Sequence, residues 1–160
     1  MPDDHQPSAD DDYFMLWVLM AQTKDAILKA RERDYARYGI TNERRAVLYA
    51  IQRHGGRATP VEIARHLFRE LHTVTELLKR MEASGLLERY EGSGRSKVEV
   101  GLTEKGLDVY MESRHNETDR RIFSVLTREE RRRLESSLLK VRSRVLEDLG
   151  IPEWQLSLLI

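Results

Sequence analysis

The spacing of apolar residues changes within residues 59–102, and this change constrains the fold more than any other feature of the sequence. Thr59-Pro60-Val61-Glu62 combines a capping box with proline at the first helical position, which predicts the start of a short helix. After a break near residues 68–70, a second predicted helix runs to about Ala83. Its apolar residues have the spacing of one buried face: Val74, Leu77, Leu78 and Met81.

The pattern then becomes that of a β-hairpin. Ser84-Gly85 predicts the end of the second helix, and residues 86–90 and 98–102 favour two strands. The intervening residues 91–97 are rich in glycine and serine, as is typical of a hairpin tip. Two short helices followed by a two-stranded hairpin are the elements of a winged helix-turn-helix.

Helices are also predicted on both sides of this segment. The first runs from about Asp12 to Tyr38, ends at Gly39, and is apolar on all sides in its first half. Thr41 is a candidate N-cap for the next helix. Thr103 predicts a helix that reaches about Val125, and the capping box at residues 127–130 predicts another that ends at Gly150.

The expected fold is therefore mostly α-helical with a small two-stranded β wing. We expect an acidic, disordered tail at residues 1–11 and a single domain at residues 12–150. Within the domain, the winged helix-turn-helix would occupy about residues 41–102, between dimerisation helices at 12–38 and 103–150. Residues 151–160 would form an apolar C-terminal tail.

The composition argues against several other classes of protein. The chain has no cysteine, which excludes disulfides and thiolate metal sites. Its longest apolar run, residues 13–21, is too short to span a bilayer, and the acidic N-terminus is unlike a signal peptide, so we expect a cytoplasmic protein. The histidines lack the spacing of metal ligands, and no catalytic or phosphate-binding motif is present. We therefore predict no metal, no cofactor and no enzymatic activity.

The second short helix has the properties of a DNA-reading element. A major groove about 12 Å wide admits one α-helix. If the apolar stripe is buried, the opposite face presents the candidate DNA-binding residues His72, Thr73, Thr75, Glu76, Lys79 and Arg80. Arg95 and Lys97 at the hairpin tip would contact a minor groove or flanking phosphates.

These same residues carry a resemblance to a known family. Residues 72–89 resemble the recognition helix and first wing strand of the MarR family (multiple antibiotic resistance regulators). Residues 98–106 resemble its second wing strand and the start of the following helix, and the resemblance covers about residues 12–149. It implies a homodimer that binds a pseudo-palindromic operator in double-stranded DNA, usually as a repressor relieved by a small ligand. It also implies DNA contacts by Thr73, Thr75 and Arg95.

Three positions depart from the pattern of that family. Ser93 stands where an aspartate often braces the wing-tip arginine. Phe68 stands in the turn between the two short helices, where a small residue is common. Glu76 stands where a basic residue is common, so it either accepts from a cytosine amino group or pairs with a cation such as Arg80.

The apolar first half of the long helix predicts self-association, because a monomer would leave part of it exposed. The candidate dimerisation residues are Tyr13, Phe14, Leu16, Trp17 and Met20.

The charge distribution leaves an alternative function open. The net charge is zero, and acidic and basic residues balance within residues 59–102. Affinity for DNA would then depend on where the cations are placed and on others outside this segment, such as Arg44 and Arg45. The alternative is a winged helix that binds a protein and not DNA.

Overall fold

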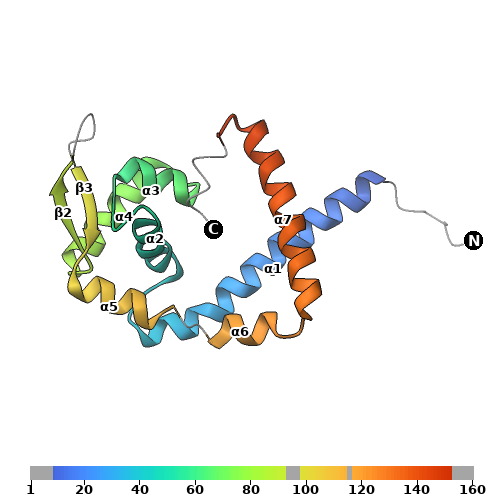
Figure 1. Ribbon diagram of the computed structural model, residues 1–160, viewed down its shortest axis with the longest axis horizontal. Helices are drawn as coiled ribbons and strands as arrows, with labels where there is room; N and C mark the ends of the chain where they lie inside the picture. The colour runs from blue at the N-terminus through green and yellow to red at the C-terminus, as the bar shows by residue number, and fades with distance from the viewer. Residues whose placement is uncertain (1–8, 93–97, 115–116, 153–160) are drawn as a thin grey trace, which may run out of the picture.

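The computed structural model describes residues 9–92, 98–114 and 117–152. Figure 1 shows a winged-helix lobe on one side and three flanking helices on the other, with α5 (Glu104–Glu112) between them. The lobe contains α2 (Asn42–Arg53), β1 (Arg57–Ala58), α3 (Pro60–Leu67), α4 (Leu71–Ala83), β2 (Leu87–Glu91) and β3 (Val98–Leu102). The flanking helices are α1 (Ala9–Arg37), α6 (Glu117–Phe123) and α7 (Arg128–Asp148). None of the helices in the described ranges is long and apolar enough to cross a membrane.

The predicted caps are present at four helix starts, among them Thr103, which accepts a hydrogen bond from the Gly106 backbone N–H at the start of α5. Thr41 accepts a hydrogen bond from the Arg44 backbone N–H at the start of α2. Thr59 and Glu62 form the capping box of α3, and Thr127 and Glu130 form that of α7. The predicted ends of α1, α4 and α7 are also confirmed to within about two residues. The first helix, however, begins at Ala9, within the segment expected to be a disordered tail; residues 1–8 and 153–160 lie outside the described residues.

The sheet has three strands where the sequence predicted two. Its order is β1-β3-β2, and both pairings are antiparallel. The short β1 pairs Arg57 with Gly101 and Ala58 with Val100. Gly101 is required here by close approach, because a Cβ at this position would lie 2.8 Å from the Tyr90 ring. The β1 strand was missed because its two residues are too few for an alternating pattern.

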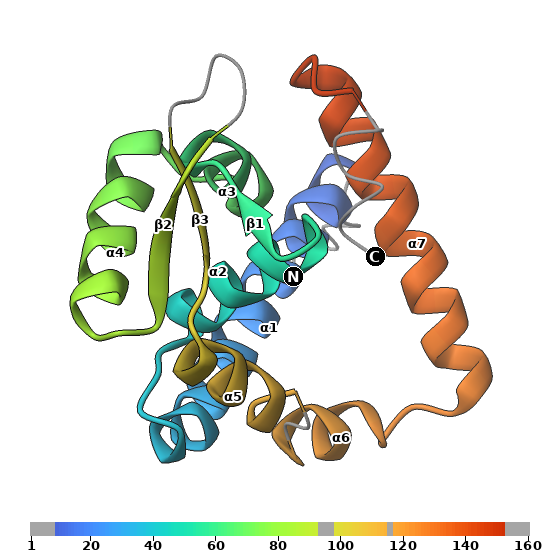
Figure 2. The ribbon, with the colours of Figure 1, turned by 60° about the vertical axis from the view of Figure 1, so that its left-hand side comes forward.

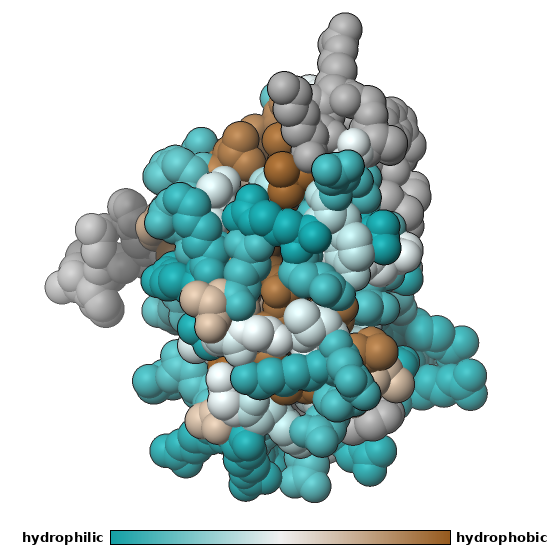
Figure 3. All heavy atoms as spheres, turned by 90° about the vertical axis from the view of Figure 1, so that its left-hand side faces the viewer, coloured by the Kyte–Doolittle hydropathy of each residue, from teal (hydrophilic) through white to brown (hydrophobic). Residues whose placement is uncertain are grey.

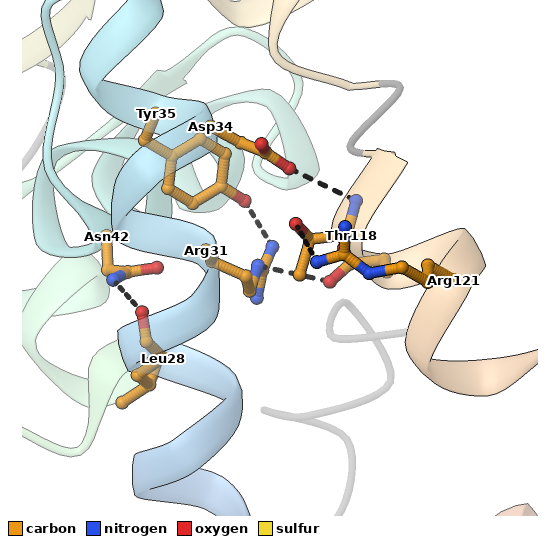
Figure 4. A network of polar contacts seen from close by, with 8 residues as sticks. Leu28, Arg31, Asp34, Tyr35, Asn42, Thr118 and Arg121 are labelled. Carbon is orange, nitrogen blue, oxygen red and sulfur yellow. Dashed lines mark hydrogen bonds and ion pairs between the residues drawn. The ribbon is translucent and has the colours of Figure 1, made fainter.

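The single helix expected from residue 103 to about 125 is wrong, because the chain forms α5 and α6 instead. Contacts with α1 fix the start of α6, as Figure 4 shows. Thr118 is buried, and its backbone N–H donates to an Asp34 carboxylate oxygen over 3.1 Å. Hydrogen bonds from Thr118 hold the pKa of Asp34 below its usual value. Arg31 adds an ion pair to Asp119 at 3.2 Å, so two side chains of α1 anchor α6.

The hydrophobic core lies inside the winged-helix lobe. Six of its largest fully buried side chains come from α1, α2, α3 and α4: Tyr35, Leu48, Ile51, Ile63, Leu78 and Met81. In contrast, α7 stands away from the lobe in Figures 1 and 2, and Leu146 is its one buried residue. The flanking helices therefore leave much apolar surface exposed in the single chain.

Candidate nucleic-acid interface

The apolar stripe of α4 is buried as the sequence predicted. Val74, Leu77, Leu78 and Met81 all face the core. Consequently the opposite face is exposed, and it brings together six of the predicted site residues: His72, Thr73, Thr75, Glu76, Lys79 and Arg80, of which Thr75 is half-buried and the others are exposed. The face of the lobe seen in Figure 3 is mostly hydrophilic, with apolar side chains visible between the hydrophilic ones.

The two threonines differ in what their hydroxyls contact. The Thr75 hydroxyl donates to the Leu71 carbonyl at 2.8 Å, so its hydrogen is used within the helix. The Thr73 hydroxyl lies 3.3 Å from the exposed His72 Nε2. Thr73 thus keeps a polar group at the first turn of the helix, where side chains of such motifs meet base edges.

Glu76 forms an ion pair, and its partner is Lys79 and not Arg80. The Lys79 Nζ lies 2.7 Å from the Glu76 Oε1. The hydrogen bond from Lys79 lowers the pKa of Glu76, so the carboxylate stays charged at neutral pH. Lys79 is partly neutralised by this pair. Arg80 forms no ion pair within 4.0 Å in the described ranges, and it is exposed on this face.

The wing is tied to α4 by a two-bond arginine–carboxylate contact. Arg89 of β2 donates from Nε and Nη2 to the two Glu82 carboxylate oxygens, at 2.5 and 2.7 Å. Across the sheet, on β1, the Arg57 guanidinium lies 3.5 Å from the centre of the Tyr90 ring of β2. The Tyr90 hydroxyl donates to Glu88 at 2.6 Å, and this hydrogen bond raises the pKa of Tyr90. These contacts fix the base of the hairpin relative to the recognition helix.

Arg95, Lys97 and Ser93 all lie outside the described residues, which stop at Gly92 and resume at Val98. The two strands that lead to the tip are confirmed, with Glu91 paired to Val98 at its base.

One arginine has a different role from the one expected, and a second was not predicted. Arg45 was considered a cation available for DNA, but its guanidinium stacks on the Tyr110 ring at 4.6 Å, and burial lowers its pKa. It therefore joins α2 to α5. Arg57, which sequence reasoning did not single out, is exposed on β1 beside the wing. Its only sequence signal is its place just before a capping box.

The predicted dimerisation residues lie on the surface of the single chain. Tyr13, Phe14, Leu16 and Trp17 are 54–72% exposed, and Met20 is half-buried. A second apolar stripe follows α7, with side chains 40–60% exposed: Leu134, Leu138, Val141, Val145 and Leu149. Phe123, Leu134 and Leu138 also line a groove between α6 and α7.

Comparisons with known proteins agree with this architecture. A model of the MarR family matches residues 38–96. The organohalide-sensing transcriptional regulator RdhR, in its ligand-free form, is 28% identical over 91% of this chain and 90% of its own, with a TM-score of 0.76. MepR from S. aureus, solved as a DNA complex, is 25% identical over 80% of this chain and 96% of its own, with a TM-score of 0.69.

A mutant of MarR from E. coli, complexed with operator DNA, has a TM-score of 0.74 at 23% identity, over 84% of this chain and 99% of its own. At that identity the likeness shows the fold. Among curated protein sequences, none matches the chain significantly. The family match covers the helix-turn-helix and the first wing strand, and the structural likeness extends over most of the chain. Residues 38–96 therefore match the MarR family, and the chain has the winged helix-turn-helix fold of MarR-family transcription regulators.

Proposed function

We propose that the protein is a homodimer that binds a pseudo-palindromic operator in double-stranded DNA and represses transcription in the bacterial cytoplasm. The observation that carries this proposal is the exposed polar face of α4 above a fully buried apolar stripe, beside a braced wing. Such a helix fits a major groove, and its first turn would meet base edges. The DNA complexes of MepR and MarR support the same assignment.

The dimer is proposed from two exposed apolar surfaces. The α7 stripe has residue spacings of four, three, four and four, which is the pattern of helices that pack against a partner helix. Together with the first half of α1, it leaves more apolar surface than a stable monomer normally exposes. A two-fold dimer would bury both surfaces and place two copies of α4 for a palindromic site.

Light scattering tests the dimer directly. We expect a mass near twice the 18.7 kDa of the chain at micromolar concentration. Leu138→Glu should shift the mass toward the monomer, because it places a charge in the apolar stripe. Ser136→Glu, on the opposite face of α7, is the matched control and should remain dimeric. A monomeric wild type would contradict the proposal.

Release from DNA by a small ligand is a further part of the proposed function. RdhR has also been solved in a 2,4-dichlorophenol-bound form. For the present chain, the proposal predicts that a bound effector weakens operator binding by favouring a dimer geometry that fits DNA less well. Halogenated phenols are the first compounds to test, by titration into a preformed protein–DNA complex. A compound that binds the protein without weakening the complex would not be an inducer.

The test of DNA binding begins with selection of duplexes from a random pool by the wild-type protein, followed by fluorescence anisotropy on the enriched sequence. Arg80→Ala should weaken binding and make the log–log salt slope shallower by about one unit. Arg132→Ala on α7 removes the same charge from an exposed position far from α4 and should leave the slope unchanged. A pool with no enriched sequence would favour the alternative of a protein-binding winged helix.

A further inference from the structure

One helix end in the winged-helix lobe differs from the others of its kind. In the described ranges, α1, α2, α4 and α7 end with a Schellman motif, whose key residue has a left-handed backbone. That residue is glycine in each: Gly39, Gly55, Gly85 and Gly150, with φ between 65° and 82°. The end of α3 has the same two hydrogen bonds, from Phe68 N–H to the Arg65 carbonyl (3.2 Å) and from Arg69 N–H to the Ala64 carbonyl (3.0 Å). Its left-handed residue is Phe68.

The conformation of Phe68 is unfavourable and is not explained by burial. With φ 51° and ψ 45°, it is the only non-glycine residue with positive φ in the described part of the chain. A β-carbon disfavours this conformation, which glycine adopts freely. Its side chain is 52% exposed, so the ring is not fixed by the core. Residues held in such a conformation concentrate at sites that bind a ligand.

Phe68 lies where the proposed DNA would pass. It ends α3, and only Arg69 and Glu70 separate it from the first residue of α4. In helix-turn-helix complexes the first helix crosses the DNA backbone and the start of the second meets the bases, so the connecting turn lies at the rim of the major groove. Leu71, which follows in α4, is also 46% exposed. The turn therefore presents two exposed apolar side chains beside the exposed polar face of α4.

We propose that the Phe68 ring contacts a thymine methyl group in each operator half-site. This inference rests on the proposed function, because it requires α4 to enter the major groove. The thymine C5-methyl is the apolar group that bases present in that groove, and phenylalanine is among the side chains that contact it. The Schellman hydrogen bonds fix the backbone of Phe68, so the ring is held at the groove rim by the helix end itself.

The test uses the operator selected by the wild-type protein, with each thymine replaced in turn by deoxyuridine, which removes only the methyl group. Wild-type affinity should fall about fourfold per half-site at one symmetric position, as expected for one buried methyl. Phe68→Ala should bind the unmodified operator less tightly by a similar factor and should not respond to deoxyuridine at that position. Phe68→Leu, which keeps an apolar side chain, should retain part of the response.

Phe68→Gly separates a DNA contact from a structural role. Glycine relieves the backbone strain, so Phe68→Gly should melt about 2–4 °C above Phe68→Ala. Its affinity for DNA should nevertheless match that of Phe68→Ala, because both lack the ring. If Phe68→Gly instead recovers affinity together with stability, the residue acts only through the fold and the proposal is wrong.

Equal responses of the wild type and Phe68→Ala at every deoxyuridine position would also overturn the proposal, whatever the overall affinity of the variant. Leu107→Ala, an exposed apolar residue on α5 that is 43% exposed, is the matched control and should respond to deoxyuridine as the wild type does. Failure of the proposed function would look different, because no sequence would then be enriched in the initial selection.

Discussion

His66 should make the winged-helix lobe less stable in mild acid. Its ring lies on α3 against the rings of Tyr49 in α2 and of His54 at the C-cap of α2, with both pairs of centroids 5.8 Å apart. The His66 Nδ1 is buried and has no hydrogen-bond partner within the described residues. Burial, with smaller contributions from His54 and Arg53, lowers the pKa of His66 from 6.5 to about 4. The folded protein therefore holds this imidazole neutral where the unfolded chain would protonate it.

The sign and size of the effect follow from this difference in pKa. Between pH 6.5 and pH 4 the unfolded state binds more protons, so the free energy of unfolding falls as the pH falls. The full lowering of the His66 pKa corresponds to a free energy of unfolding that is about 2 kcal/mol smaller at pH 5 than at pH 8. Because the ring is only partly buried, solvent screening reduces this loss of stability, and we expect the free energy of unfolding to fall by about 1 kcal/mol. Stability is fully retained above pH 6.5.

The assay is urea unfolding at pH 8, 6.5 and 5, on the wild type and on His66→Gln, which cannot take up the proton. The variant should lose about 1 kcal/mol less than the wild type between pH 8 and pH 5. Carboxylates such as Asp34 affect both proteins equally and cancel in the difference. His72→Gln, at an exposed histidine of α4, is the matched control and should follow the wild type. Parallel profiles for the wild type and His66→Gln would refute the reasoning.

Other substitutions test the packing and the polar contacts. Gly106→Ala should lower the free energy of unfolding by about 3 kcal/mol or more, because its Cβ would lie 2.0 Å from the Leu86 carbonyl oxygen. Thermal melting measures this loss of stability, and a melting temperature within a degree of the wild type would contradict the prediction. Arg89→Ala should lower the free energy of unfolding by less than about 1 kcal/mol, because the ion pair of Arg89 with Glu82 is partly exposed. This loss of stability, measured by urea unfolding, should be smaller in 1 M salt. Glu76→Ala should strengthen non-specific binding to DNA, because it frees Lys79 from its ion pair. If Glu76 reads a cytosine, the variant should also discriminate about tenfold less at one operator position, measured on a panel of single-base operator variants. A uniform shift in affinity across the panel would exclude base reading by Glu76.

The elements that the sequence predicted correctly have signals within a few residues of one another. Capping boxes and the α4 stripe are of this kind, and they placed α3, α4 and α7. The missed features depend on contacts between distant residues. β1 exists because Arg57 pairs with Gly101, and α6 begins where it does because Thr118 reaches Asp34. No local pattern encodes either contact.

The sequence predicted which face of α4 forms the candidate site, but not the contacts among its charged residues. The exposed face of α4 followed from the buried stripe, because the two faces of one helix are complementary. The sequence did not predict which charged residues on that face form an ion pair. Glu76 is within reach of either Lys79 or Arg80, and the structure shows that it pairs with Lys79. The stacking of Arg45 on Tyr110 was also invisible, because it joins two helices that lie far apart in the sequence.

The start of α5 is joined to the end of α4 at several points. The Thr103 hydroxyl donates to the Gly85 carbonyl at 2.6 Å, and the Lys105 Nζ donates to the Ser84 carbonyl at 2.8 Å. Gly106 lets the two segments approach without an intervening side chain. These contacts couple the start of α5 to the end of α4, so we expect a tilt of α5 to move α4 with it. In the proposed dimer, we therefore expect the tilt of α5 to affect the distance between the two recognition helices, which operator DNA requires to be close to one helical turn of about 34 Å.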